Sequence, residues 1–225
     1  MEAHSYNAKV APPVDLAARI ADWARELGFG ALGISDADLD DAPTRLADWI
    51  AAGRHGTMEY MARHAALRSA PGDLVPGTIR VISARFDYWP AAARDARGVL
   101  DDRERAYVSR YALGRDYHKL VRAKLQALAD RIAEASGPFG YRVFCDSAPV
   151  MEVAFAAKAG LGWRGKHTLL LSRDAGSLFF LGELYTDLPL PHTAPVPEHC
   201  GTCRACLDAC PTGAIVAPWE LDARR

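Results

Sequence analysis

The feature that most constrains this chain is a run of four cysteines near the end of its 225 residues. Their spacing is C-x2-C-x2-C-x3-C, followed at once by a proline, which is the pattern of bacterial ferredoxins. In that pattern the first three thiolates bind one [4Fe–4S] cluster and the fourth binds a second cluster. We therefore expect iron–sulfur ligands at Cys200, Cys203, Cys206 and Cys210.

Other uses of these cysteines are disfavoured. A zinc site usually separates two ligand pairs by roughly a dozen residues or more, whereas all four thiols here fall within one short stretch. Disulfides need an oxidising compartment, and the sequence does not begin with a basic, apolar leader, so we expect a cytoplasmic location. No cysteine follows Cys210, so we expect either one incomplete cluster or a sequence that is the front part of a longer electron-transfer enzyme.

Composition is that of a globular enzyme. The chain is 50% hydrophobic and 24% charged, and it contains no apolar run of the roughly 18 residues that a membrane span requires. The net charge of −1 provides no overall attraction to nucleic acid. Because a local basic face could still exist, composition neither demands nor excludes an RNA substrate.

Apolar periodicity and turn residues predict an α/β (α+β) fold with a mixed sheet and flanking helices. The sequence predicts helices over 16–27, 46–52, 58–64, 117–135 and 150–158, and strands over 29–35, 78–86, 141–145, 167–172 and 177–185. The last two strands read as a β-hairpin with its turn at 173–176. Prolines cluster between Pro189 and His199, so we predict a catalytic domain over 1–190 and a partial ferredoxin-type module over 191–225. That module is too short to fold without iron or the body of the protein.

A second informative block begins at Asp146, where a strand gives way to a loop. A carboxyl group in a buried pocket can have its pKa raised and can donate a proton near neutral pH. The alternative is that Asp146 caps the following helix. Further on, Gly160, Gly162 and Gly165 suggest a tight loop whose backbone approaches a large ligand. Their G-x-G-x-x-G pattern precedes a strand and opens no helix, which disfavours a nicotinamide site.

Several separate segments resemble the epoxyqueuosine reductases, a family of cobalamin-dependent iron–sulfur enzymes. The resemblance covers nearly the whole chain and preserves the order of the family's motifs. The segments are GTMEYM at 56–61, PGTIRVI at 76–82, SRYALGRDYH at 109–118, DSAPVMEVAFAAKAGLGWRGKHTLLLSRDAGSLFFLGELYTDLPL at 146–190 and CGTCRACLDACPTGAIVAP at 200–218.

The resemblance implies an oxidoreductase that performs the last step of queuosine biosynthesis on tRNA. It would reduce epoxyqueuosine at the wobble position to queuosine with loss of water, using cobalamin and two [4Fe–4S] clusters. An external electron donor and a monomeric state are also implied. The family's proton donor maps onto Asp146. The resemblance assigns Cys200, Cys203 and Cys206 to the first cluster and Cys210 to the cluster near the corrin.

Contacts to the corrin are expected from two matching segments and from the glycine-rich loop. These candidates, which include the acid itself, are Arg68, Ser109, Arg110, Tyr111, Asp146, Lys166, His167 and Thr168. His167 is not expected to ligate cobalt, because the family is thought to leave that position without a protein imidazole. We interpret His118 as structural and Cys145 as a buried, unreactive thiol.

Two other functions remain open at this point. A related corrinoid reductase, similar to the reductive dehalogenases, would act on a small molecule and ignore tRNA. A ferredoxin-type electron carrier would need only the cysteine module and would bind no corrin.

Overall fold

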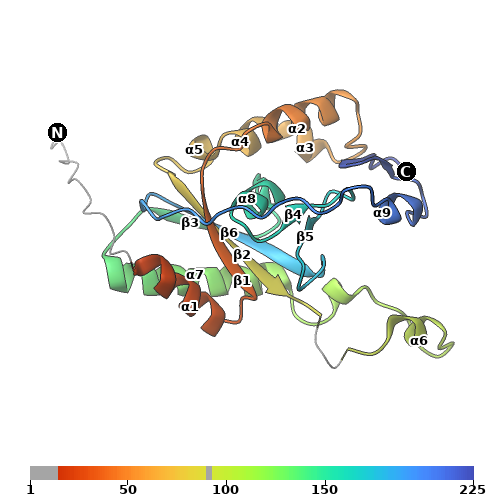
Figure 1. Ribbon diagram of the computed structural model, residues 1–225, viewed down its shortest axis with the longest axis horizontal. Coiled ribbons are helices and arrows are strands. Elements are labelled where there is room, and N and C mark those ends of the chain that lie inside the picture. The colour runs from red at the N-terminus through yellow and green to blue at the C-terminus, as the bar shows by residue number, and fades with distance from the viewer. Residues whose placement is uncertain (1–14, 90–92) are drawn as a thin grey trace.

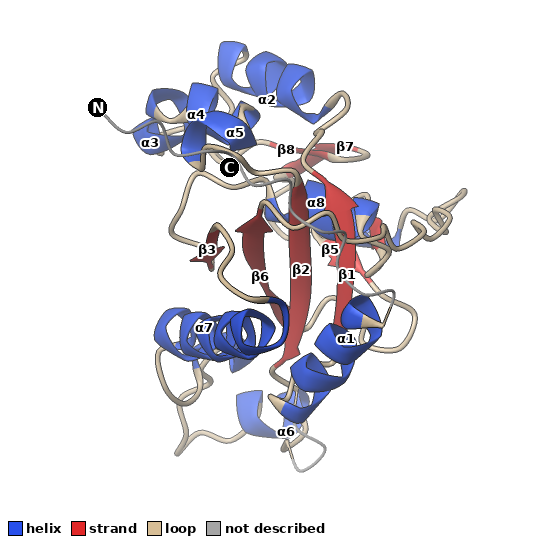
Figure 2. Cartoon of the chain, turned by 90° about the vertical axis from the view of Figure 1, so that its left-hand side faces the viewer, coloured by secondary structure: helices blue, strands red, loops and turns tan. Residues whose placement is uncertain are grey.

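The central element is a four-stranded sheet with strand order β1-β2-β6-β3 (Figures 1 and 2). The computed structural model describes residues 15–89 and 93–225. The strands are β1 (Ala31–Asp36), β2 (Arg80–Asp87), β6 (Phe179–Thr186) and β3 (Tyr141–Phe144). Each pair of neighbours in this sheet runs antiparallel.

The antiparallel pairing follows from where the long connections return to the sheet. Asp36 at the end of β1 is paired with Arg80 at the start of β2, so the chain re-enters at the end it left. The same holds for Asp87 at the end of β2 and Phe179 at the start of β6. A parallel neighbour would require a crossover to the opposite end of the sheet. The fold class is confirmed, but the sheet is antiparallel rather than mixed.

Helices cover both faces of the sheet (Figure 1). One face packs against α1 (Leu16–Glu26) and α7 (Tyr117–Ser136), and the other against α8 (Glu152–Lys158). The main apolar core lies between the sheet and the α1–α7 pair, whose inward residues recur at helical spacing. It includes Ile20, Leu125, Leu128, Ile132, Ile82 and Leu184. Within the described ranges, no helix combines the length and apolarity needed to cross a membrane.

The connections carry the remaining helices. Four short ones lie between β1 and β2, beyond one end of the sheet (Figure 2): α2 (Ala42–Ala51), α3 (Glu59–Arg63), α4 (Ala65–Ser69) and α5 (Pro71–Leu74). Between β2 and α7 the chain projects away from the body and forms α6 (Ala96–Leu100) and the 3-10 turn η1 (Arg110–Ala112).

Residues 191–225, here named the cysteine segment, form small elements on the surface of the body. These are α9 (Ala205–Asp208), β7 (Ile215–Ala217) and β8 (Glu220–Leu221). Within 191–225 only Asp222 is buried. Indole N–H groups make two of its attachments: Trp49 donates to the carbonyl of Leu221 (2.6 Å), and Trp219 donates to the carbonyl of Arg164 (3.0 Å). The domain boundary near residue 190 stays a prediction.

The secondary-structure predictions from sequence are mostly confirmed, with one clear error. The predicted hairpin over 167–185 does not form, because β6 pairs along its whole length with β2 and over 183–186 with β3. The preceding segment contributes only β5 (Leu170–Leu171), which pairs with β4 (Trp163–Arg164). All that remains of the hairpin is a single bridge between Ser172 and Gly176.

Candidate active site

The carboxyl group of Asp146 lies in a polar cluster at the end of β3, beside the first turn of α7. The hydroxyl of Tyr117 donates a hydrogen bond to Asp146 Oδ2, and His118 Nε2 lies 3.1 Å from the same oxygen. The side chain of Asp146 is 54% exposed, so a substrate can reach it. Asp146, Tyr117, His118 and Asp116 are here named the acid site.

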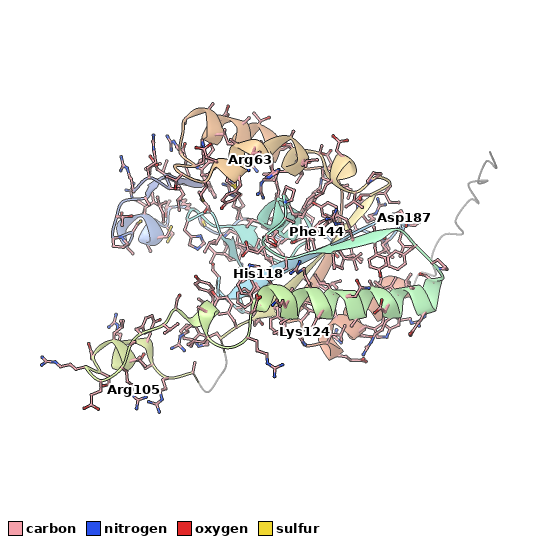
Figure 3. The ribbon with its side chains drawn as sticks, turned by 180° about the vertical axis from the view of Figure 1, so that it is seen from behind. Arg63, Arg105, His118, Lys124, Phe144 and Asp187 are labelled. Atoms are coloured by element: carbon pink, nitrogen blue, oxygen red, sulfur yellow. The ribbon has the colours of Figure 1, made fainter. Side chains whose placement is uncertain are left out.

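Asp116 positions the histidine from the other side. Its carboxylate caps α7 by accepting from the backbone N–H of His118 (3.0 Å), and it also contacts His118 Nδ1 (2.9 Å). These contacts lower the pKa of Asp116. Figure 3 shows His118 at the start of α7, well away from Arg105 in the projecting loop. The imidazole therefore bridges two carboxyl groups, one of which is Asp146.

Stacked rings hold Tyr117 in place. Its ring lies parallel to that of Phe180 on β6 (centroids 3.9 Å apart, 5° between planes) and stacks on His118 (4.0 Å). Burial and the hydrogen bond to Asp146 raise the pKa of Tyr117, so the phenol remains a donor. The rigid stack fixes where the Asp146 carboxyl must sit in order to be hydrogen-bonded.

Asp146 does not cap the following helix. The N-cap position of α8 is Met151, and the side chain of Asp146 points to α7 instead. Its backbone adopts φ +59°, a left-handed conformation that only a few residue types tolerate, aspartate among them. The backbone N–H of Asp146 donates to Glu152 Oε1 over 2.6 Å. The helix-cap alternative is therefore excluded.

Arg68 supports the loop that carries the acid. From α4 its guanidinium donates to the carbonyl of Val150 (3.0 Å) and weakly to that of Ala148 (3.4 Å). Its Nε is buried without a partner among the described residues. Burial lowers the pKa of Arg68. The side chain is thus committed to the 146–150 loop, and its predicted contact with a corrin stays a prediction.

The predicted corrin contacts Ser109, Arg110 and Tyr111 lie next to the acid site. Tyr111 is exposed and meets the ring of Tyr117 edge-on, with centroids 6.5 Å apart. The guanidinium of Arg110 lies over the ring of Trp89 at 3.9 Å. Ser109 is the N-cap residue of η1 but makes no side-chain cap bond. These residues border a surface on which large apolar side chains are exposed.

The predicted corrin contacts on the glycine-rich loop, Lys166, His167 and Thr168, lie in different surroundings. Lys166 is only 8% exposed, and its ammonium donates to the carbonyls of Gly201 (2.6 Å) and Cys203 (2.9 Å). It therefore holds the cysteine segment. His167 Nε2 lies 3.3 Å from Ser177 Oγ, and burial lowers its pKa. Thr168 has φ +77°, which makes the turn before β5.

The glycines of this loop have a structural explanation. A Cβ added to Gly162 would come within 2.0 Å of the carbonyl oxygen of Leu171. Gly160, with φ +79°, similarly faces the carbonyl oxygen of Ala194. The close approach is therefore to the protein's own backbone, whereas the sequence suggested an approach to a ligand.

The four predicted cluster ligands all carry free thiols. Cys203 is exposed and the other three are partly exposed. Backbone N–H groups, chiefly that of Ile215, lower the pKa of the Cys210 thiol. Across residues 15–89 and 93–225, no three His, Cys, Asp or Glu side chains are grouped so as to hold a metal ion. Their role as cluster ligands stays a prediction. Cys145 is buried, as expected from the sequence, and burial raises its pKa.

Two cavities lie where the cysteine segment meets the body. Their volumes are about 610 Å³ and about 510 Å³, and both are lined by Trp163 and Val196. The first also contains Lys158 and Trp219, and the second contains Arg85. Asp146 lines neither of these two cavities.

Sequence reasoning did not identify the partners of the acid. Tyr117 and His118 follow an aspartate at the start of a predicted helix, and such a helix start with two titratable rings is a usable signal. Interpreting His118 as structural does not account for its contact with Asp146. Glu152, which binds the Asp146 amide, was also missed.

Comparison with known proteins places these residues in a family. Residues 68–147, a range that contains Tyr117, His118 and Asp146, match the family described as Epoxyqueuosine reductase QueG, DUF1730. The epoxyqueuosine reductase of Pseudomonas aeruginosa is 60% identical over 214 residues, which make up 95% of this chain and 59% of that protein. The chain thus spans about three fifths of the length of this relative.

Solved structures agree. A crystal structure of epoxyqueuosine reductase with an epoxyqueuosine-modified tRNA-Tyr stem loop has a TM-score of 0.81 and 27% identity, covering 95% of this chain and 56% of that one. The enzyme from Bacillus subtilis, in a structure with its catalytic aspartate loop swung out of the active site, has a TM-score of 0.79 and 28% identity, at the same coverage. The chain belongs to the epoxyqueuosine reductase family.

Proposed function

We propose that this protein takes part in the reduction of epoxyqueuosine in tRNA to queuosine and that Asp146 is its proton donor. The observation that carries the proposal is the placement of an exposed carboxyl group between the Tyr117 hydroxyl and His118 Nε2. Family membership supplies the substrate: a relative binds a tRNA stem loop that carries epoxyqueuosine. Another relative has a catalytic aspartate on a loop, and Asp146 is likewise on a loop.

The chemistry needs an acid. Converting an epoxide to an alkene consumes two electrons and two protons and releases the oxygen as water. An alkoxide is a poor leaving group, so a proton must reach that oxygen as the carbon–oxygen bond breaks. A positioned general acid of this kind is typically worth about 10²–10⁴ in rate. Of the two exposed carboxyl groups in the acid site, Asp146 is the one that both Tyr117 and His118 contact, and we assign this proton to it.

His118 can restore the proton. A neutral imidazole donates from one nitrogen and accepts at the other, so donation from Nδ1 to Asp116 leaves Nε2 as an acceptor toward protonated Asp146. Conversely, an imidazolium donates to both carboxylates. Asp116, His118 and Asp146 can therefore share one mobile proton, and Asp116 is exposed enough to exchange it with water.

The residues beside the acid site fit a large macrocycle. Large apolar side chains are exposed in the segments that contact the acid site, namely Trp89, Tyr111 and Leu178. Contacts join this surface, since Tyr88 N–H donates to the Leu178 carbonyl and Tyr111 meets Tyr117. We propose that Ser109, Arg110 and Tyr111 contact a corrinoid there, and that His167 and Thr168 do so from the glycine loop.

The cysteine segment fits iron–sulfur chemistry by its donor set. Four free thiols are present, and backbone amides favour the thiolate form of Cys210, as they do in iron–sulfur proteins. Lys166 holds the carbonyls of Gly201 and Cys203 and so keeps this segment on the body. When bound, a corrinoid would supply the reducing metal centre, and the clusters would supply its electrons. Cluster number and the external donor belong to this proposal.

The test is turnover of the modified nucleoside. The protein, and the longest reading frame that contains it, are reconstituted without oxygen with cobalamin, iron and sulfide, then given a chemical reductant and tRNA carrying epoxyqueuosine. Nucleosides are separated after digestion and identified by mass. The expected result is conversion of epoxyqueuosine to queuosine, with no conversion when cobalamin is omitted.

Other outcomes would point elsewhere. Unchanged tRNA together with dehalogenation of a halogenated aromatic would favour the small-molecule reductase and overturn the proposal. Clusters that accept electrons without any corrin spectrum would favour an electron carrier.

A further inference from the structure

A second carboxyl group lies buried behind the acid site, in the middle of the sheet. Glu183 on β6 is opposite Ser83 on β2 and Phe144 on β3, and it is 0% exposed. Its carboxyl group interacts with that of Glu152, and Ser83 Oγ has no hydrogen-bond partner in the described part of the chain. An unpaired charge there would be very costly, so the group remains protonated. Burial, followed by the nearby Glu152 carboxylate, raises the pKa of Glu183 well above its usual value.

Glu152 connects this buried carboxyl to the acid. It is the first residue of α8, which packs across β1, β2 and β6. Its Oε1 accepts the backbone N–H of Asp146 over 2.6 Å. Burial, helped by the charge of Asp146, raises the pKa of Glu152 to about 7. The acceptor of this hydrogen bond therefore changes charge near neutral pH.

Titratable groups from each neighbouring element face Glu152. The charged or acidic ones are Glu183 on β6, Arg68 on α4 and Asp146 after β3. The weaker acids whose pKa values respond to Glu152 are Tyr185 on β6, Tyr117 on α7 and Cys145. In this set Arg68 is the one cation, and it opposes the rise in the pKa of Glu152.

We propose that Glu152 is a positioning residue: its carboxylate holds the Asp146 amide and, with Arg68 on the loop carbonyls, fixes the loop that presents the acid. The proposal rests on the proposed function only in naming Asp146 as the acid. The loop is held at both ends. The Glu152 carboxylate binds the amide of Asp146, and the Arg68 guanidinium binds the carbonyl of Val150. These two contacts also hold Asp146 in its left-handed backbone conformation, which few residue types adopt.

The ionised form of Glu152 is the better acceptor, since hydrogen bonds to charged groups are the stronger ones. The loop is therefore held more tightly above the midpoint of the Glu152 titration than below it. Glu183 is neutral, so it places no second negative charge beside the Glu152 carboxylate. The acid site thus contains a pH-dependent constraint separate from the titration of its own groups.

The first experiment needs no substrate. In ¹⁵N-labelled protein, the amide proton shift of Asp146 and its exchange rate with water are followed from pH 5.5 to 8.5, values chosen to bracket the midpoint of about 7. The variants are Glu152→Ala, which removes the acceptor, and Glu152→Gln, which keeps an acceptor oxygen but cannot titrate. Glu59→Gln is the matched control, because Glu59 is also the first residue of a helix and is exposed.

The expected result is a step in the wild-type Asp146 shift near neutral pH that both Glu152 variants abolish. Exchange of this amide should be about tenfold or more faster in Glu152→Ala, as expected for loss of a hydrogen bond to a charged acceptor. Glu59→Gln should match the wild type. A wild-type shift without a step, or a step that survives Glu152→Gln, would overturn the proposal.

A kinetic arm separates positioning from simple structural support. In the assay of the reading frame that contains this chain, Glu152→Ala should lower kcat with little change in KM for tRNA. Glu152→Gln should recover most of kcat and lose only the dependence on pH. If no form of the enzyme turns over tRNA, the proposed function fails while the amide measurement still decides the role of Glu152. Equal kcat in Glu152→Ala and wild type would count against positioning.

Discussion

The acid site and the cysteine segment are held in place by different interactions. Tyr117 is the first residue of α7 and Asp146 follows β3, and these two elements are joined through a core of fully buried side chains such as Leu125. In the cysteine segment only Asp222 is buried, and contacts with the body include hydrogen bonds from Lys166 and Trp49 and an ion pair between Arg54 and Glu220.

The difference shows which part of the protein can keep a fixed geometry without bound ligands. Apolar burial between the sheet and the helices α1 and α7 stabilises the geometry of the acid site whether or not a ligand is bound. The cysteine segment has little apolar burial of its own, so its order depends on a few polar contacts and on whatever its thiols bind. We therefore expect chemistry, stability and local opening to respond to different substitutions in the two regions.

The largest effect is expected at the acid itself. Asp146→Asn keeps the shape of the side chain but removes its acidic proton, so kcat should fall about 10²–10⁴-fold. The nucleoside assay measures this, with the corrin spectrum as a check that cofactor binding survives. Asp130→Asn on the exposed side of α7 is the matched control and should be fully active. Normal turnover by Asp146→Asn would remove it from the mechanism.

The next effect tests the core beneath the acid site. Leu125→Ala should lower the free energy of unfolding by about 2–5 kcal/mol, because Leu125 is 0% exposed and packs beside Gly182 on β6. Urea unfolding followed by circular dichroism gives this value. Leu100→Ala in the projecting α6, where the side chain is 62% exposed, should change it by less than about 0.5 kcal/mol. Equal losses in the two variants would contradict the proposed difference between buried and exposed regions.

A smaller and local effect is expected in the cysteine segment. Lys166→Met removes the ammonium that binds two carbonyls, so peptides covering 198–210 should exchange their amide hydrogens about tenfold or more faster. Hydrogen exchange with mass spectrometry measures this, and the peptides of α7 should be unaffected. Lys119→Met is the control, since Lys119 is exposed. Should reconstitution with iron fail to slow this exchange, the idea that bound clusters order the segment would be wrong.

The smallest effect concerns an exposed ion pair across the two helices of the core. Glu26→Gln breaks the contact of Glu26 with Arg131, whose atoms are 2.6 Å apart. Both side chains are exposed to solvent, so the free energy of unfolding should change by about 0–1 kcal/mol. The same urea experiment measures it, and added salt should reduce the difference. A loss as large as that of Leu125→Ala would mean that polar contacts also stabilise the body.

Local patterns in the sequence were reliable wherever neighbouring residues decide the structure. The helical spacing of Val121, Leu125 and Leu128 predicted α7, and the β-branched run around Val81 predicted β2. The hairpin failed because the whole sheet decides which strands pair, and here β2 pairs along all of β6 while β3 pairs with its last four residues. Periodicity describes a segment, not its neighbours.

The candidate site shows the same division. Asp146 could be selected from its position after a strand and from family resemblance. Its partner Tyr117 lies 29 residues earlier in the chain, and the two side chains meet only because α7 packs against β3. Lys166 holds the cysteine segment, because a buried ammonium must bind acceptors and the carbonyls there provide them; its contact with a corrin stays a prediction.

The amino-acid sequence by itself determined the helices and strands of the body, the cysteine pattern and the family, since these depend on the order and spacing of residues along the chain. Only the tertiary structure decided that the sheet is antiparallel, that Asp116, His118 and Asp146 form a connected chain, and that Glu152 holds the acid's backbone. The physical reason is that pairing of strands, burial of a carboxyl and contact between distant side chains are set by packing in three dimensions.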